Sequence, residues 1–216
     1  MGESIVNVSY HPFMKPGGDV LAERLGRPHL YLPLCYGTDE IRQHMRTLAQ
    51  TLSLTYEPDA ALEQRAEDAL SEAKRVIGDT PIAVDYSATM RPLGLARLLV
   101  EHGFNVTKLY IDNLNGEESA DFDWLREQRP DINLYPTVHA KMRVTDRGSA
   151  EKILAIGQKA AYFNDTPYFV NMVEGGGMYG FDGIAKLARL MKEAFLEEKD
   201  TKALIQIKGL GCGCCA

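Results

Sequence analysis

Short apolar segments rich in β-branched residues alternate along the chain with longer segments in which apolar residues recur at helical spacing. The short segments predict strands at residues 5–8, 30–34, 82–86, 104–111, 132–138 and 168–173. The longer segments predict helices at residues 17–25, 38–52, 58–76, 91–102, 122–128, 149–158 and 183–196. This alternation is typical of βαβ units, so the sequence predicts an α/β fold with mainly parallel sheets.

Several predicted helices carry residues that commonly begin or end a helix. Thr38 and Asp182 are the predicted N-caps of two of them. Gly26 ends one helix, and Gly103 ends another directly after His102, whose imidazole is expected to bond the free carbonyls there.

The long helical segment between Glu57 and Arg75 separates two parts of the chain. We predict a partial first α/β lobe at residues 1–56, a second Rossmann-like lobe at residues 57–196, and a C-terminal tail at residues 197–216. In open parallel sheets, ligands bind beyond the carboxyl ends of the strands. The candidate site segments are therefore those that follow the predicted strands: 9–13, 35–37, 86–91, 139–141 and 174–182.

Charge and hydropathy argue against two classes of function. The chain has 24 Lys and Arg against 30 Asp and Glu, a net charge of −6, and its basic residues are scattered among acids. Nucleic-acid binding is therefore not expected. No apolar run reaches the roughly 18 residues of a membrane span, and the first residues lack the pattern of a signal peptide. We expect a cytoplasmic protein without a membrane partner.

The four cysteines are very unevenly distributed. Cys35 stands alone in an apolar segment, whereas Cys212, Cys214 and Cys215 crowd the end of the sequence. A disulfide framework spreads its cysteines, so this spacing argues against one. Three neighbouring thiolates suit zinc, copper(I) or an iron–sulfur cluster, with a fourth ligand from Cys35, a second subunit or a small molecule. The alternative is an oxidisable terminus without a metal; we favour metal or cluster binding.

A glycine-rich segment precedes the last predicted helix. Residues 175–180 read G-G-G-M-Y-G and match the pattern G-x-G-x-x-G. In dinucleotide-binding domains this pattern lies in the first βα turn, and another strand with an acidic residue follows it. Almost no chain remains here for that strand, so a tight turn that approaches a neighbour or a ligand is the better interpretation.

Side chains at the predicted strand ends are the candidates for chemistry. Arg91 opens a helix, where it either holds an anionic ligand or pairs with an acid such as Asp85. Of the histidines, His11 and His139 follow strands and are the better candidates, whereas His44 is expected to be structural. Neither a Ser-His-Asp order nor an H-E-x-x-H motif supports hydrolase chemistry.

A set of short motifs occurs in a fixed order along the chain. The most specific is Y-G-F-D-G at residues 179–183 with the helix after it. The others are the strand and Arg-Pro helix at 82–92, G-F-x-V at 103–106, R-P-D at 129–131 and L-G-R-P at 25–28. Over residues 5–196 these motifs resemble, collinearly, the nitrogenase component 1 family, in particular the second and third domains of the molybdenum–iron protein α subunit and related reductases.

The resemblance implies α/β domains that hold a metallocluster or tetrapyrrole substrate between them, and an ATP-dependent iron protein as electron donor. It places Arg91 on an arginine that contacts the cofactor, and His139 or Lys141 near a lysine that meets its organic acid. The cofactor-ligating cysteine and histidine fall at Tyr10 and Tyr179. Phenols replace both ligands poorly, so the iron–molybdenum cofactor itself is not expected here. A counterpart of the family's first domain, with its cluster cysteines, is also missing.

Together these observations predict an oxidoreductase subunit that binds a metallocluster or a reducible substrate between its lobes. The cofactor-binding candidates are Arg91, His139, Lys141, Tyr179 and Tyr10, and the metal candidates are the three cysteines of the tail. An iron–sulfur cluster or related metallocluster, and a homo- or hetero-oligomer, are expected. The alternatives are a non-catalytic scaffold or carrier for iron–sulfur or metallocofactor assembly, and a plain small-molecule binding module.

Overall fold

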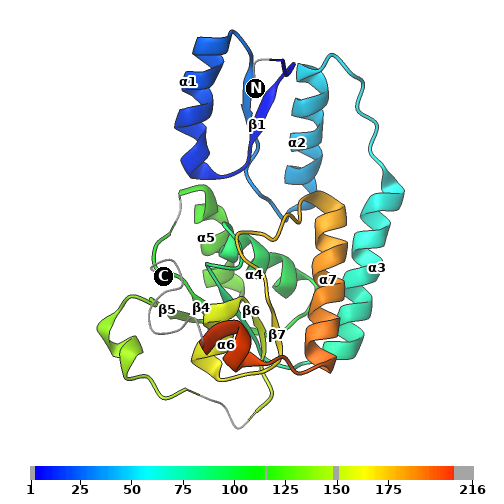
Figure 1. Ribbon diagram of the computed structural model, residues 1–216. Helices are drawn as coiled ribbons and strands as arrows, with labels where there is room; N and C mark the ends of the chain where they lie inside the picture. The colour runs from blue at the N-terminus through cyan, green and yellow to red at the C-terminus, as the bar shows by residue number, and fades with distance from the viewer. Residues whose placement is uncertain (1–2, 115, 148–150, 207–216) are drawn as a thin grey trace.

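In the computed structural model, residues 3–114, 116–147 and 151–206 are described. Their strands form two sheets, a small one near the N-terminus and a larger one below it in Figure 1. Every paired strand runs parallel to its neighbour. The prediction of an α/β fold with mainly parallel sheets is therefore confirmed.

The small sheet has two strands and is flanked by two helices (Figure 1). Its elements, in chain order, are β1 (Asn7–Ser9), the 3-10 turn η1 (Pro12–Met14), α1 (Lys15–Leu25), β2 (His29–Tyr31) and α2 (Thr38–Thr51). Helix α1 ends as expected at Gly26, which adopts the left-handed φ of 59°. Thr38 is the first residue of α2 and not its N-cap, which is Gly37.

The large sheet has five strands in the order β5-β4-β3-β6-β7. Its first elements are α3 (Ala60–Ile77), β3 (Ile82–Asp85), α4 (Pro92–Glu101), β4 (Val106–Tyr110), η2 (Gly116–Glu118), α5 (Ser119–Gln128) and β5 (Asn133–Tyr135). The later elements are η3 (Ala140–Arg143), β6 (Leu154–Ile156), α6 (Gln158–Asn164), β7 (Phe169–Val170), α7 (Gly180–Leu196) and the short helical turn η4 (Lys202–Gln206).

Both faces of the large sheet are covered, because successive strand residues point to opposite sides. Ile82 and Val84 of β3 pack into a core with buried residues of α3, α4 and α7. Ala83, between them, packs into a second core with α6. Helices α3 and α7 run side by side along the first face (Figure 1). The large sheet is therefore the middle layer of a helix–sheet–helix arrangement.

Two further predicted helix ends can be compared with the structure. The His102 Nδ1–H donates to the Leu98 carbonyl at 2.7 Å, so the expected cap at the end of α4 is confirmed. Asp182 is not the N-cap of the last helix, because α7 begins earlier and Tyr179 occupies the cap position. Asp182 lies in the first turn, where its charge is favourable for the helix dipole, and it pairs with Arg65.

The helix predicted at residues 149–158 is wrong. Residues 154–156 form β6, which pairs with β3 on one side and β7 on the other; residues 148–150 lie outside the described residues. Residues 153–156 are all buried, and a short continuous apolar run does not distinguish a buried strand from a buried helix. Gly157, at a φ of 108°, ends the strand, and α6 begins directly after it.

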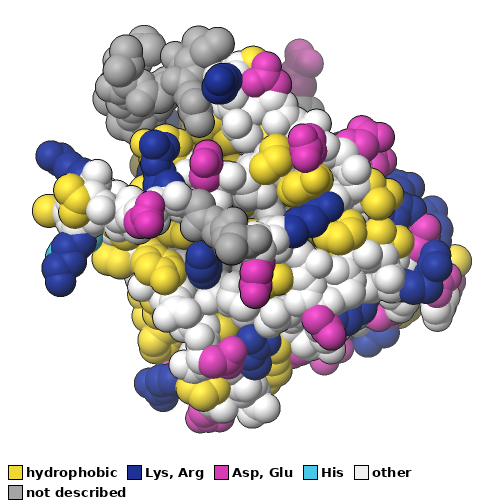
Figure 2. All heavy atoms as spheres, turned by 90° about the horizontal axis from the view of Figure 1, so that it is seen from below, with side chains coloured by type: hydrophobic (Ala, Val, Ile, Leu, Met, Phe, Trp, Pro, Cys, Tyr) yellow, Lys and Arg dark blue, Asp and Glu magenta, His cyan; other side chains and the backbone are white. Residues whose placement is uncertain are grey.

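The surface shown in Figure 2 carries basic and acidic side chains interspersed with each other. Over the described residues, this face therefore presents mixed charge and not a field of one sign. None of the helices in the described ranges is both long enough and apolar enough to cross a membrane.

Candidate functional site

Polar side chains gather where two central strands of the large sheet end. The strand order is β5-β4-β3-β6-β7. After β3 the chain continues to one side of the sheet, with β4 and β5, and after β6 it continues to the other side, with β7. The strand order therefore reverses between β3 and β6. In open parallel sheets, ligands bind outside the carboxyl ends of strands at such a switch point. We call the residues directly after β3 and β6, at 86–91 and 157–160, the carboxyl edge.

Asp85, the last residue of β3, connects the two halves of the carboxyl edge. Its buried carboxylate accepts hydrogen bonds from the N–H groups of Ser87 (2.8 Å), Ala88 (3.1 Å) and Ala160 (2.7 Å), and from the Ser87 hydroxyl (2.5 Å). Burial raises the pKa of this carboxyl, and the hydrogen bonds oppose that rise. One side chain thus fixes the loop after β3 to the first turn of α6.

Lys159 is the cation of the carboxyl edge. Its half-buried ammonium donates to the Tyr86 hydroxyl and lies 4.2 Å from the centre of the Tyr86 ring. Within the described ranges, no carboxylate comes within ion-pair distance of the ammonium. Asp112 is the nearby acid: burial raises the pKa of its carboxyl, but hydrogen bonds and the charge of Lys159 lower it by more, although the two make no ion pair. A lysine without a direct ion pair at a switch point is suited to an anionic group of a ligand.

Sequence reasoning missed Lys159 because it read the preceding strand as part of a helix. The signal that was available is the glycine at 157 directly after the run of four apolar residues at 153–156. A strand that ends at such a glycine places the next residues at the carboxyl edge.

Arg91 is buried between the segment that follows β2 and the large sheet, and its side chain is 7% exposed. Nη1 donates to the Leu34 carbonyl and the Glu40 carboxylate, both at 3.3 Å, and Nη2 donates to Asp121 at 3.1 Å. Its Nε is buried and has no hydrogen-bond partner among the described residues. Asp85, the acid considered from the sequence, is not among these partners. Arg91 therefore joins the segment after β2 to α5, and two acids match its charge.

Glu118 is a buried carboxyl at the beginning of α4. Its Oε1 accepts hydrogen bonds from the N–H groups of Leu93 at 2.8 Å and Gly94 at 3.2 Å, which the helix itself leaves unpaired. Burial raises the pKa of Glu118 to about 7, although these bonds and the charge of Arg91 oppose the rise. The protein therefore holds a proton on Glu118 at a pH where the unfolded chain has lost it.

This carboxyl predicts a pH dependence of stability. Between its ordinary pKa of 4.5 and about 7, the folded protein binds more protons than the unfolded chain, so the free energy of unfolding falls as pH rises. Glu118→Gln keeps the acceptor for both N–H groups and removes the titration. We expect the variant to gain stability relative to the wild type as pH rises across this window, measured by urea denaturation at pH 4.5 to 8. A difference that does not change with pH contradicts the prediction.

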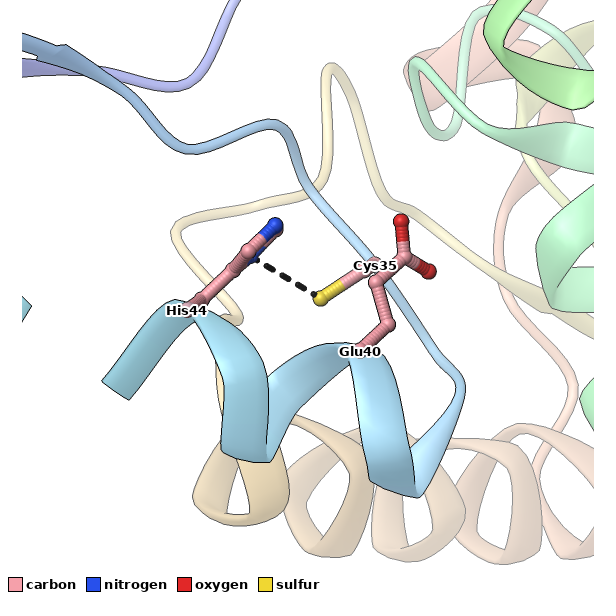
Figure 3. Close-up of side chains that lie close together, drawn as sticks. All are labelled: Cys35, Glu40 and His44. Atoms are coloured by element: carbon pink, nitrogen blue, oxygen red, sulfur yellow. Dashed lines mark hydrogen bonds between the residues drawn. The ribbon is translucent and has the colours of Figure 1, made fainter. Parts of the chain in front are cut away.

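Three side chains that commonly bind metals converge beside Arg91 (Figure 3). Glu40 and His44 are one turn apart on α2 and so share a face, and Cys35 reaches them from the loop after β2. The Cys35 Sγ lies 3.4 Å from the His44 Nδ1, and one ligand atom from each residue lies within 4.8 Å of the others. Burial raises the pKa of the Cys35 thiol to about 12 and lowers the pKa of His44. Without a metal, the pair is a thiol and a neutral imidazole.

Tyr179, a candidate from the sequence, belongs to the same group. Its hydroxyl lies 2.9 Å from the His44 Nδ1, and it also faces the carbonyls of Leu32 (3.4 Å) and Pro33 (3.3 Å). Burial raises the pKa of this phenol, so the hydroxyl keeps its proton. Arg91 and Tyr179 thus share one neighbourhood, with Glu40, Cys35 and His44 between them. Sequence reasoning took Cys35 and His44 separately and did not consider Glu40.

The other candidates make no polar contact with this group within the described residues. Tyr10 is 45% exposed, and His139 caps the exposed turn η3, where its Nδ1 accepts from the N–H of Lys141 at 3.2 Å. Within the described residues, no hydrogen bond or ion pair joins any of these three to Arg91 or Tyr179. The tail cysteines at 212, 214 and 215 lie outside the described residues.

The two positions at which the resemblance places the family's cluster ligands do not fit that role. One is the exposed phenol of Tyr10, and the other is the Tyr179 phenol, which stays protonated and bonded to His44 and the backbone. Neither supplies the thiolate or imidazole that such a cluster needs. The donors that the described residues offer are instead Cys35, Glu40 and His44.

Comparisons with known proteins show the family from the sequence and a similar fold from a solved structure. A family model described as nitrogenase component 1 type oxidoreductase matches residues 1–196. A solved structure described as "Nitrogenase Cp1 at pH 6.5" superimposes with a TM-score of 0.57 at 15% identity and covers 90% of this chain. The chain spans 46% of that protein's length. Among curated protein sequences, none matches this chain.

Proposed function

The chain belongs to the nitrogenase component 1 type oxidoreductases, and on this basis we propose that it is a reductase subunit that binds an anionic, reducible ligand at its carboxyl edge. The observation that carries the proposal is Lys159, a half-buried ammonium that makes no direct ion pair within the described residues. It lies at the switch point where open parallel sheets bind ligands.

The neighbours of Lys159 prepare it for this role. The Tyr86 hydroxyl takes one of its three donors and orients the ammonium, which leaves the others for an acid group of the ligand. The Asp85 network fixes the backbone on both sides, so the position of the charge is set before the ligand arrives. Arg91, whose charge two acids already match, is a positioning residue that keeps the segment after β2 against the large sheet.

Electron supply is the second part of the proposal. Members of this family bind metalloclusters and work as oligomers with an iron-protein partner. We propose a homo- or hetero-oligomer in the cytoplasm that receives electrons from such a donor. A cluster would supply single electrons to the bound ligand; its ligands are proposed to come from Cys212, Cys214 and Cys215, since the positions of Tyr10 and Tyr179 do not fit.

Lys159→Gln tests the ligand site, with citrate as the probe because it carries several carboxylates. Losing a charge-assisted hydrogen bond is expected to weaken citrate binding by about 10- to 100-fold, measured by isothermal titration calorimetry. Lys141→Gln is the matched control, since Lys141 is exposed and lies near the position that the family resemblance suggests.

The two variants separate the alternatives. Unchanged affinity in Lys159→Gln, or a loss in Lys141→Gln instead, removes Lys159 from the site. A wild-type protein that binds no citrate at low salt contradicts an anionic-ligand site of this kind. Raising the salt concentration should weaken citrate binding if the ammonium faces solvent on its ligand side.

A further inference from the structure

Beyond the ligand site, the structure contains a group of metal-binding side chains that the proposed function does not use. We propose that Cys35, Glu40 and His44 form a site for a single divalent transition-metal ion of the zinc type. The three residues come from α2 and from the loop that precedes it; the Cys35 sulfur points at His44, and the Glu40 carboxylate lies on the other side of Cys35 (Figure 3). The site goes beyond the proposed function and depends neither on Lys159 nor on the tail cysteines.

The distances match those of a tetrahedral site. With zinc–sulfur and zinc–nitrogen bonds of about 2.3 and 2.1 Å, two ligands at a tetrahedral angle lie about 3.6 Å apart. The Cys35 Sγ and His44 Nδ1 are 3.4 Å apart. One carboxylate oxygen of Glu40 lies within 4.8 Å of both atoms, so this oxygen would move closer to them when an ion binds.

The donor chemistry selects the metal. A thiolate, an imidazole and a carboxylate form a mixed soft and hard set, which suits zinc or a similar late divalent ion better than magnesium or calcium. The thiolate and the carboxylate each contribute one negative charge, and Glu40 shares its charge with Arg91. Three protein ligands leave a fourth position for water or an exogenous ligand, as in sites that act on substrates.

The surroundings already hold the ligands in place. Arg91 donates to one oxygen of Glu40, which fixes the carboxylate and leaves the other oxygen, which accepts no hydrogen bond within the described residues, for the metal. Tyr179 contacts the His44 Nδ1 that the metal would take, but its hydroxyl also faces two backbone carbonyls at 3.3 and 3.4 Å. Releasing Nδ1 therefore does not leave the phenol without an acceptor.

Metal binding must displace a proton. The buried Cys35 carries its proton when no metal is present, so the ion exchanges with it: the S–H bond breaks, the sulfur–metal bond forms, and one proton passes to solvent. Affinity is therefore expected to rise with pH, and each ion bound is expected to release close to one proton. A purely structural thiol, donating weakly to His44, would release none.

Cobalt(II) titration of the full chain tests the site. The titration uses a variant of the full chain with Cys212→Ser, Cys214→Ser and Cys215→Ser, so that Cys35 is its sole thiol. We expect saturation at one cobalt ion per chain, a thiolate-to-cobalt charge-transfer band, the visible bands of four-coordinate cobalt, and their loss on adding zinc. Cys35→Ser should abolish the charge-transfer band. Loss of a residue that only hydrogen-bonds to a metal ligand typically weakens metal binding by about 10- to 100-fold. Glu40→Gln and His44→Gln each remove a ligand itself, so each should weaken cobalt binding by more than that.

The matched control is His102→Gln. His102 also sits on a helix and pairs with a glutamate, Glu67, at 3.0 Å, but that pair has no cysteine beside it. It should leave the cobalt spectrum unchanged. His44→Gln changes a half-buried residue, so it keeps the test valid if Cys35→Ser fails to fold. The proposal is overturned if the tail variant shows no charge-transfer band and releases no proton, or if Cys35→Ser or His44→Gln binds cobalt as tightly as their parent.

Discussion

Gly157→Ala is expected to lower the free energy of unfolding by about 3 kcal/mol or more. Gly157 has a φ of 108°, which an L-residue adopts only with strain. A Cβ at this position would also overlap the carboxylate of Asp85. Because Asp85 accepts four hydrogen bonds across the carboxyl edge, moving it disrupts both central strands at once.

Urea denaturation followed by circular dichroism measures this loss. Gly17→Ala is the control: it lies in α1, its Cβ would meet no atom within 4 Å, and its φ is not left-handed. That substitution should be neutral or stabilise by up to about 1 kcal/mol, because alanine favours a helix. A Gly157→Ala protein as stable as the wild type would show that β3 and β6 do not end against each other as described.

Arg91→Met is expected to lower the free energy of unfolding by about 3–5 kcal/mol, because it leaves Glu40 and Asp121 without their buried cation. Methionine retains most of the apolar bulk, so the loss reports charge more than packing. Adding Glu40→Gln and Asp121→Asn removes the uncompensated charges and should recover a substantial part of the stability. This recovery separates electrostatic imbalance from a cavity, which the additional substitutions would not fill.

Arg97→Met is the matched control for Arg91→Met. Arg97 also pairs with Asp121, at 3.3 Å, but its side chain is 35% exposed. Its loss should cost about 1 kcal/mol or less, because solvent screens exposed pairs. Equal losses in the two variants, measured by urea denaturation, would mean that burial of Arg91 does not decide its contribution.

The sequence was informative where the polar and apolar pattern was distinctive. The αL glycine after α1 and the histidine cap of α4 follow from local chemistry, and both are found. The central strand β6 was misread because its three residues are buried on both faces, which removes the alternation that identifies a strand. That one error hid Lys159, since a residue can be placed at a strand end only after the strand is recognised.

The metal-binding group could not be found from spacing alone. Glu40 and His44 are four residues apart, which any helix with two such residues would show. Two contacts of His44 distinguish this pair: one with Cys35 from the loop before α2, and one with the Tyr179 hydroxyl, 135 residues away in sequence. Contacts of that range depend on how α7 packs beside α2, which no local pattern records.

Glu40 is shared between two structural roles. One of its oxygens receives the inter-segment bond from Arg91, and the carboxylate also belongs to the set beside Cys35 and His44. Ion binding at this group and packing of the segment after β2 against the large sheet are therefore thermodynamically linked, and this linkage is reciprocal. The free energy by which a bound ion stabilises the packing of the two sheets equals the free energy by which that packing strengthens ion binding.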